Sequence, residues 1–221
     1  MKTANQVLLD KIKDYVFRKM ETVDAGHDIS HIKRVLSNAQ LINEREKGNA
    51  FLIEAGVLLH DITDEKLFNK EQAEKELIIF LQENEVYEDT IQLLLSIINA
   101  VSFGSEFDKS VKLSLEQKVV RDADRLDAIG AIGIARAFHY GGGKNRELFN
   151  EDIPPQTYQS TKEYRKSTSP TINHFYEKLL LLKDRMETET GKKMAQQRHE
   201  YMLGFLQQFY TEINTKGFSL E

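Results

Sequence analysis

Apolar side chains recur every three to four residues along most of the chain, which is the period of a helix with one buried face. Glycine, asparagine and polar clusters interrupt this pattern and mark the ends of the segments. No stretch shows the alternation of apolar and polar residues that is typical of a half-buried strand. The pattern predicts helices over residues 4–20, 29–46, 50–62, 70–83, 87–101, 115–138, 171–187 and 191–213. We therefore expect an all-α protein.

Two stretches, 103–113 and 139–170, lack this periodicity and are predicted to be loops. The second opens with three glycines and contains all three prolines, and loops longer than about 15 residues are uncommon unless they are functional or disordered. It is either a lid over a substrate or a surface excursion. We expect a single domain over 1–221, a helical bundle with its core at about 20–140 and a helical extension at about 171–215 packed on it. Aromatic residues at helical spacing are predicted to lie in the core: Phe175, Tyr176, Tyr201, Phe205 and Phe209.

The composition narrows the class of protein. With 221 residues and 40% apolar side chains, the chain can bury a sizeable core. A net charge of -5 does not suit a general nucleic-acid-binding protein, and the absence of cysteine excludes disulfides and thiolate metal sites. No stretch approaches the roughly 20 apolar residues of a membrane span, and the N-terminus resembles a polar helix rather than a signal peptide. We expect a cytoplasmic monomer or homodimer that does not bind membranes.

A histidine and an aspartate, His60 and Asp61, end the apolar run 51–59. Burying both is costly unless they are paired, hydrogen-bonded or bound to a metal. Taken alone, the pair has a simple interpretation, in which the histidine lies at the negative end of a helix and the aspartate caps the next turn. Other residues of the chain favour a different interpretation.

Further polar residues interrupt apolar patterns elsewhere. His31 lies near the start of the predicted helix 29–46. The segment 121–127 places three acids and two arginines among apolar residues, so part of this acidic cluster must lie near the core. Helical geometry alone does not choose between Asp122, Asp124 and Asp127 as the residue with a special role.

A histidine, a later His-Asp pair and a distant aspartate form a pattern that resembles the HD superfamily of metal-dependent phosphohydrolases. The flanking residues extend the match to the segments 26–35 (GHDISHIKRV) and 122–127 (DADRLD). Residues 174–179 (HFYEKL) resemble a segment of the small stand-alone bacterial members. The resemblance therefore covers nearly the whole chain, and it implies hydrolysis of phosphate ester or anhydride bonds.

The resemblance implies that the metal ligands are His31, His60, Asp61 and Asp124. Two imidazoles and two carboxylates suit Mn²⁺, which we favour, as well as Mg²⁺, Fe²⁺, Co²⁺ or Ni²⁺. Members with two metals use additional histidines between the His-Asp pair and the last aspartate. Because no histidine occurs from 62 to 138, we expect one metal ion. Asp127 lies one turn after Asp124, on nearly the same face, where it is placed to support the ligands.

Two residues after the His-Asp pair are candidates for the chemical step. Asp64 and its neighbour Glu65 resemble the acidic pair of HD hydrolases that cleave hyperphosphorylated guanine nucleotides. Asp64 is predicted to orient or deprotonate the attacking water, and the alternative is a cap on a solvent-facing turn. Lys66 either neutralises phosphate charge or is an ordinary surface lysine.

Several basic residues are candidates for binding phosphate. His27 either contacts a substrate phosphate or makes a hydrogen bond at the start of a helix. Arg34 and Arg125 either bind phosphate or pair with acids near Asp124. In the long loop, basic residues are expected to bind a polyphosphate: Lys144, Arg146, Lys162, Arg165 and Lys166.

The resemblance implies a nucleotide substrate. The favoured reaction is hydrolysis of nucleoside triphosphates to monophosphate and pyrophosphate. One alternative is a phosphomonoesterase that acts on 5′-nucleotides. A third possibility, from a different class, is a non-catalytic HD module that holds a metal and senses a nucleotide.

Overall fold

The computed structural model describes residues 2–20, 29–64, 68–101, 112–158, 163 and 167–218. Within these ranges the secondary structure is helical and includes no strand, so the prediction of an all-α protein is confirmed. The chain divides into two compact units, Met1–Asp124 and Arg125–Glu221. None of the described helices is both long and apolar enough to cross a membrane. The expectation of one domain over the whole chain stays a prediction.

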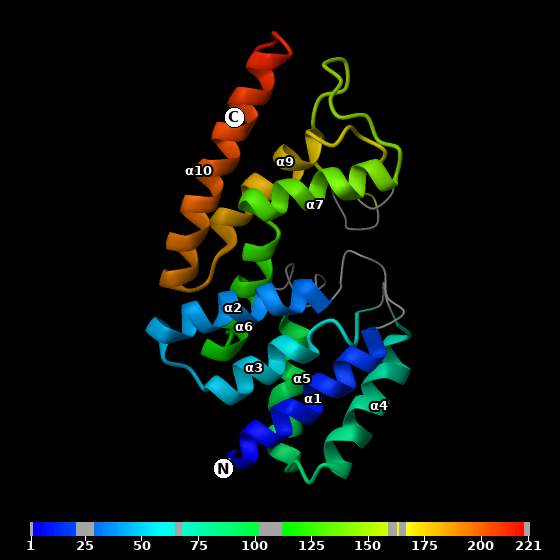
Figure 1. Cartoon of the computed structure of the whole chain (residues 1–221), viewed down its shortest axis with the longest axis vertical. Coiled ribbons are helices and arrows are strands. Elements are labelled where there is room, and N and C mark those ends of the chain that lie inside the picture. The colour runs from blue at the N-terminus through cyan, green and yellow to red at the C-terminus, as the bar shows by residue number, and fades with distance from the viewer. Residues whose placement is uncertain are drawn as a thin grey trace. The chain divides into compact units, whose positions relative to one another are not determined.

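The first unit is built around helix α3 (Figure 1). Its helices are α1 (Ala4–Met20), α2 (Ile29–Glu46), α3 (Ala50–Leu59), α4 (Lys70–Glu83), α5 (Glu88–Val101) and most of α6 (Leu115–Asp127). Helix α3 packs against α1, α2 and α5, which explains why nearly all of its side chains are apolar and buried. The predicted bounds of α1, α2 and α4 are confirmed, whereas α3 ends at Leu59 rather than at 62.

Two local features fix the position of α3. The Asn49 side chain caps its start by accepting a hydrogen bond from the Leu52 N–H at 3.2 Å. Gly56 lies directly against α5, where an added Cβ would approach Ile97 Cγ2 to 2.7 Å. The glycine therefore permits close packing of α3 on α5, which holds the C-terminal end of α3 inside the unit.

The second unit contains the end of α6, then α7 (Gly130–Gly143), α9 (Asn173–Glu177), the 3₁₀-helix η2 (Leu179–Arg185) and α10 (Glu189–Glu212). Helix α10 packs on α7 and on η2, and α9 packs on η2 (Figure 1). Aromatic rings fill the space between these helices. Phe138 lies 6.1 Å from Phe175 and 5.9 Å from Phe205, measured between ring centroids.

The prediction of one helix over 115–138 is wrong, because α6 ends at Asp127 and α7 begins at Gly130. Gly130 has a φ of 77°, a left-handed conformation that favours glycine and cannot continue a helix. The prediction that a loop starts at 139 is also wrong, because α7 continues to Gly143. The three glycines at 141–143 therefore form the C-terminal end of this helix. Gly141 packs so closely on Thr171 that a side chain would not fit between them.

The prediction of one helix over 171–187 is wrong as well. Lys178 has backbone angles of φ -145° and ψ -57°, which end α9 and start η2. In a 3₁₀-helix, residues three apart lie on one face, and Leu179 and Leu182 are both buried in this way. Among the predicted core aromatics, Phe175 is fully buried, whereas Tyr201 is 60% exposed on α10.

Candidate metal centre

The His60–Asp61 pair lies on the turn that directly follows α3, and both side chains are buried. His60 Nδ1 lies 2.7 Å from the Val57 carbonyl oxygen, so this ring nitrogen carries the proton and donates it. The other nitrogen, Nε2, is then left as an acceptor. A backbone carbonyl that fixes the tautomer in this way is the usual support for a metal-binding histidine.

Three further groups converge on His60 Nε2. His31, buried on α2, places its Nε2 atom 3.4 Å away. Asp61 Oδ1 lies 3.3 Å from His60 Nε2, while Asp61 Oδ2 lies 3.6 Å from His31 Nε2. Asp124 on α6 directs Oδ1 to both rings, at 3.4 Å from His31 Nε2 and 3.8 Å from His60 Nε2.

This donor set fits a divalent metal ion. One ligand atom from each of His31, His60 and Asp124 lies within 4.8 Å of the others, and Asp61 contacts both imidazoles. Two imidazoles and two carboxylates are hard-to-borderline ligands, which first-row divalent ions and Mg²⁺ accept. Burial of His31, His60 and Asp61 next to the half-buried Asp124 is costly without a cation to balance the acids.

The electrostatics of the site also favour a cation. Burial opposes protonation of His60, but the carboxylates of Asp61, Asp124 and Asp64 and the Val57 carbonyl outweigh it and raise the pKa of His60. The group of acids therefore creates a negative potential at the imidazole nitrogen. A positive charge at that point is stabilised whether it is a proton or a metal ion.

Asn38 is a residue of this site that sequence reasoning missed. Its side-chain Nδ2 donates to the Ala123 carbonyl oxygen at 3.1 Å, which joins α2 to α6 next to Asp124. Asn38 follows His31 by two helical turns on the buried face of α2. A buried amide on an otherwise apolar stripe is the signal that identifies such a residue.

Asp64 lies at the end of the same turn as His60 and Asp61. Its backbone N–H donates to the Asp61 carbonyl oxygen at 3.2 Å, and its carboxylate is one of the groups that raise the pKa of His60. Its side chain is half-buried. The structure thus brings Asp64 close to the proposed ligands, as a residue that acts on water must be.

Arginines and acids next to Asp124 are held by other contacts. Arg125 is buried, donates from Nη1 to the Arg185 carbonyl and lies 3.9 Å from a Glu187 carboxylate oxygen. Asp127 is buried and accepts a hydrogen bond from Arg136 Nη1 at 2.5 Å. These contacts favour a structural role for Arg125, in which it pairs with an acid. The alternative, that Arg125 binds the substrate phosphate, stays a prediction.

The remaining candidates are distributed over both units. Arg34 is half-buried on α2, one turn after His31. In the second unit, Lys144 is exposed and Arg146 is half-buried, and both cations lie over the Tyr140 ring, at 5.9 and 5.5 Å from its centroid. Arg146 also donates from Nη2 to the Ser167 carbonyl at 2.5 Å. Predicted residues that lie outside the described part of the chain are His27, Lys66, Lys162, Arg165 and Lys166.

Comparisons with known proteins identify the family of the chain. The family model of the HD domain matches residues 28–129, a range that includes all four residues of the proposed metal centre. YpgQ of Bacillus subtilis is 34% identical over 210 residues, which cover 92% of this chain and 93% of YpgQ.

Solved structures show the same likeness. The crystal structure of an HD-superfamily hydrolase from Bacillus thuringiensis is 40% identical, covers 96% of this chain and 100% of its own, and has a TM-score of 0.78. The crystal structure of Bacillus subtilis YpgQ in complex with ADP is 32% identical, covers 95% of this chain and 97% of its own, and has a TM-score of 0.73.

Proposed function

Because the chain belongs to the HD-domain family of metal-dependent phosphohydrolases, we propose that it hydrolyses nucleoside triphosphates to monophosphate and pyrophosphate. The proposal rests on the convergence of His31, His60 and Asp61, which are buried, with the half-buried Asp124 in one cluster. A nucleotide substrate is supported by the complex of the relative YpgQ with ADP.

The four residues would hold one divalent metal ion, with Mn²⁺ favoured. A bound divalent ion supplies charge neutralisation for phosphate and lowers the pKa of water. Within the protein, the Val57 carbonyl holds the tautomer of His60, and Asn38 holds α6 in register with α2. These contacts keep the four donors pointed at a common position before substrate arrives.

Asp64 is proposed as the residue that orients the attacking water and accepts its proton. The water oxygen attacks the α-phosphorus, and the bond between that phosphorus and the bridging oxygen to the β-phosphate breaks. Pyrophosphate then leaves with the bridging oxygen. A half-buried carboxylate next to the ligand cluster is well placed for such a proton transfer.

The experiment that tests this proposal is a screen of nucleoside mono-, di- and triphosphates with Mn²⁺, Mg²⁺, Co²⁺ or Ni²⁺, with products resolved by chromatography. We expect monophosphate and pyrophosphate in equal amounts from triphosphates. Release of orthophosphate from monophosphates would instead identify a 5′-nucleotide phosphomonoesterase. Tight nucleotide binding without any turnover would leave only a sensing role.

Metal content provides the second test. We expect one ion per chain in the unsubstituted protein and a joint loss of metal and turnover in His60→Ala. The matched control is His139→Ala, since His139 is exposed on α7 and lies in the other unit. Two tightly bound ions per chain, or full metal occupancy in His60→Ala, would contradict the proposed centre.

A further inference from the structure

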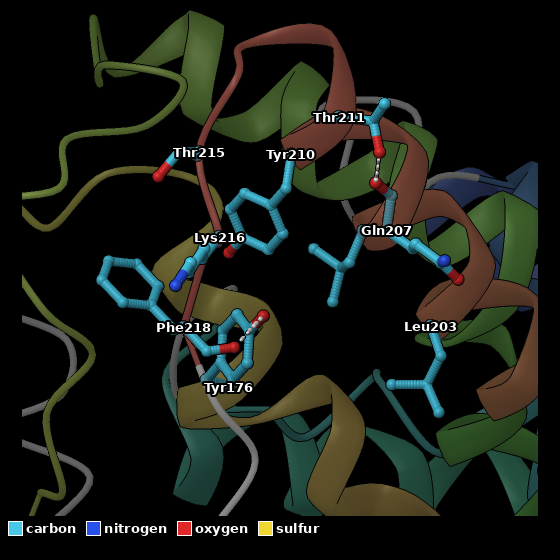
Figure 2. A pocket seen from close by; sticks show the side chains of 9 residues that line it. Tyr176, Leu203, Gln207, Tyr210, Thr211, Thr215, Lys216 and Phe218 are labelled. Carbon is cyan, nitrogen blue, oxygen red and sulfur yellow. Dashed lines mark hydrogen bonds between the residues drawn. The ribbon is translucent and has the colours of Figure 1, made fainter.

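A pocket of about 320 Å³ lies in the second unit, between the C-terminal part of α10, α9 and the tail that follows α10 (Figure 2). Its volume is at the lower end of the roughly 300–1,000 Å³ of small-molecule sites. The lining combines aromatic, aliphatic and polar side chains, among them Tyr176, Leu203, Tyr210, Lys216 and Phe218. None of these residues belongs to the proposed metal centre.

Specific contacts build the wall that the tail contributes. The Thr215 N–H donates to the Tyr210 carbonyl oxygen at 3.1 Å, and the Tyr176 hydroxyl donates to the Phe218 carbonyl oxygen at 3.1 Å. Between them, Gly217 has a φ of 68° and lies so close to the Tyr210 ring that a Cβ would overlap it. Residues 215–218 are therefore held against α9 and α10.

Aromatic rings give the pocket its shape. The ring of Phe218 is nearly perpendicular to that of Tyr176, at 89° with centroids 5.7 Å apart, and to that of Tyr210, at 82° with centroids 6.5 Å apart. Figure 2 shows the three side chains on the tail side of the pocket and Leu203 on the opposite side. Rings at right angles present both faces and edges, which suits a flat aromatic ligand.

One buried polar atom in the lining makes no hydrogen bond of good geometry with the described residues. This atom is the hydroxyl of Tyr210, a residue that is only 6% exposed. Burial and the neighbouring Tyr176 hydroxyl raise the pKa of Tyr210, while the Phe218 backbone lowers it, so both groups lie near this hydroxyl; the Phe218 carbonyl already accepts the proton of Tyr176. Buried hydroxyls nearly always have a partner, so a ligand atom that bonds Tyr210 would complete the site.

The charge of the residues that line the pocket determines whether it favours an anionic or a cationic ligand. Lys216 is the single charged residue among those that line the pocket, and no acidic side chain of the described residues lines it. An ammonium group beside an apolar wall attracts a carboxylate or a phosphate. A cationic ligand would find no counter-charge in the lining.

We propose that this pocket binds a flat aromatic molecule that carries one anionic group. The ring packs against Tyr176, Tyr210 and Phe218, the anion pairs with Lys216, and a polar atom of the ligand bonds the Tyr210 hydroxyl. Aromatic carboxylates and nucleoside monophosphates share this chemistry. The site is independent of the proposed hydrolysis, because it uses none of the same residues.

The test uses the absence of tryptophan from the chain. Leu203→Trp places a single fluorescent reporter in the lining, and Tyr201→Trp places one at an exposed position of the same helix. We expect naphthoate to change the fluorescence of Leu203→Trp in a saturable way and to leave Tyr201→Trp unchanged. Adding Lys216→Gln should weaken binding about tenfold, the scale of one charge-assisted hydrogen bond, whereas Lys193→Gln on α10 should not.

The tryptophan introduced in Leu203→Trp could itself fill the pocket and block the ligand. Binding is therefore also measured by calorimetry on the chain without this substitution. Here naphthoate should bind, and both Lys216→Gln and Tyr210→Phe should weaken it. Naphthalenemethanol, which lacks the charge, should bind more weakly than naphthoate. If adenosine monophosphate displaces naphthoate, the site is assigned to nucleotides. If naphthoate stays bound in its presence, the site is assigned to aromatic carboxylates. No binding of naphthoate to the chain without a reporter, or equal binding of the charged and neutral probes, would overturn the proposal.

Discussion

Asp64 is the residue at which position and proposed chemistry are most directly linked. It follows the ligand pair by one turn, and its carboxylate acts on His60. Asp64→Asn keeps the shape of the side chain and removes the base. We expect it to retain the metal and to lose about 10²-fold or more in turnover, the usual scale for a positioned general base. Metal analysis and steady-state kinetics measure the two effects separately.

The control for this variant is Asp14→Asn, since Asp14 is exposed on α1 of the same unit. Near-normal turnover of Asp64→Asn with full metal would show that Asp64 caps a turn. Loss of metal together with turnover would place Asp64 among the ligands instead.

His174 on α9 makes stability depend on pH. Burial, together with Lys178 and Arg146, lowers its pKa from 6.5 to about 3. Between pH 6.5 and 3 the histidine is therefore protonated in the unfolded chain but neutral in the folded chain. The free energy of unfolding is unaffected by this group above pH 6.5 and decreases as the pH falls towards 3. Since one pKa unit corresponds to about 1.4 kcal/mol, the loss reaches up to about 5 kcal/mol.

Urea unfolding at a series of pH values measures this dependence. His174→Gln should show a shallower loss of stability between pH 6.5 and 3 than the unsubstituted chain, whatever its stability at neutral pH. His139→Gln, at an exposed position, should keep the slope. An unchanged slope in His174→Gln would mean that another group carries the pH dependence.

At the scale of single residues, the His-Asp pair at the end of an apolar run drew attention because it is costly to bury, and the resemblance to the HD superfamily then implied the full set of ligands. Sequence reasoning did not indicate Asn38, whose role depends on the carbonyl of Ala123, 85 residues later. Nor did it reveal that Val57 fixes the tautomer of His60. An amide on the apolar face of α2 is a signal that Asn38 has a partner, but the sequence does not say which backbone carbonyl that partner is, so only the fold identifies the contact.

The packing of α3 on α5 depends on the glycine between them. In Gly56→Ala, the new Cβ would lie 2.7 Å from Ile97 Cγ2, so one helix must shift. We expect a loss of about 1–3 kcal/mol in the free energy of unfolding, the typical cost of overpacking. Because His60 directly follows the last residue of α3, we also expect weaker metal binding. Chemical denaturation and metal titration measure these effects.

Gly204→Ala is the matched control. Gly204 lies inside α10 with no atom within 4 Å of an added Cβ, so alanine should stabilise the helix by about 0.5–1 kcal/mol. In the double variant Gly56→Ala/Ile97→Ala, the clashing methyl group is gone. Its destabilisation should be smaller than the sum of the two single effects. Strict additivity would show that the two positions do not interact.

At the scale of elements, periodicity located α1, α2 and α4 correctly because each has one buried face and clear ends. It failed where apolar residues continue across a break. The run through 115–138 keeps a helical period, yet the chain breaks between α6 and α7, where Gly130, the first residue of α7, has a left-handed conformation. The close approach of Arg198 to Gly130 accompanies this break, and a contact 68 residues away is not readable from a local pattern.

At the scale of the molecule, the chain carries a net charge of -5 while its proposed substrate is a polyanion. Local cations must then offset the repulsion, and Lys144 and Arg146 are candidates. Replacing both with glutamine should raise the KM for triphosphates more than the inhibition constant of the monophosphate product, with little change in kcat. Higher ionic strength should act in the same direction, since exposed charges are screened over about 8–10 Å at physiological salt.

Lys11→Gln/Lys75→Gln, at two exposed lysines of the first unit, controls for the change in net charge alone. Equal effects of the double variant on triphosphate and monophosphate would show that these residues do not distinguish the length of the phosphate chain. No effect on either would leave Arg146 with its contacts to Ser167 and Tyr140 as a structural residue.

Metal binding also tests whether the chain behaves as the single domain expected from its sequence. All four proposed ligands belong to the unit Met1–Asp124, so the ion contacts only one of the two compact units. A ligand that binds only the folded state stabilises it by about 2.7 kcal/mol at a hundredfold excess over its Kd. If the units unfold together, Mn²⁺ should slow hydrogen exchange of the most protected amides equally in α3 and in α10. His60→Ala should abolish the effect in both helices. Slower exchange in α3 alone would mean that Arg125–Glu221 unfolds by itself and that the chain forms two domains.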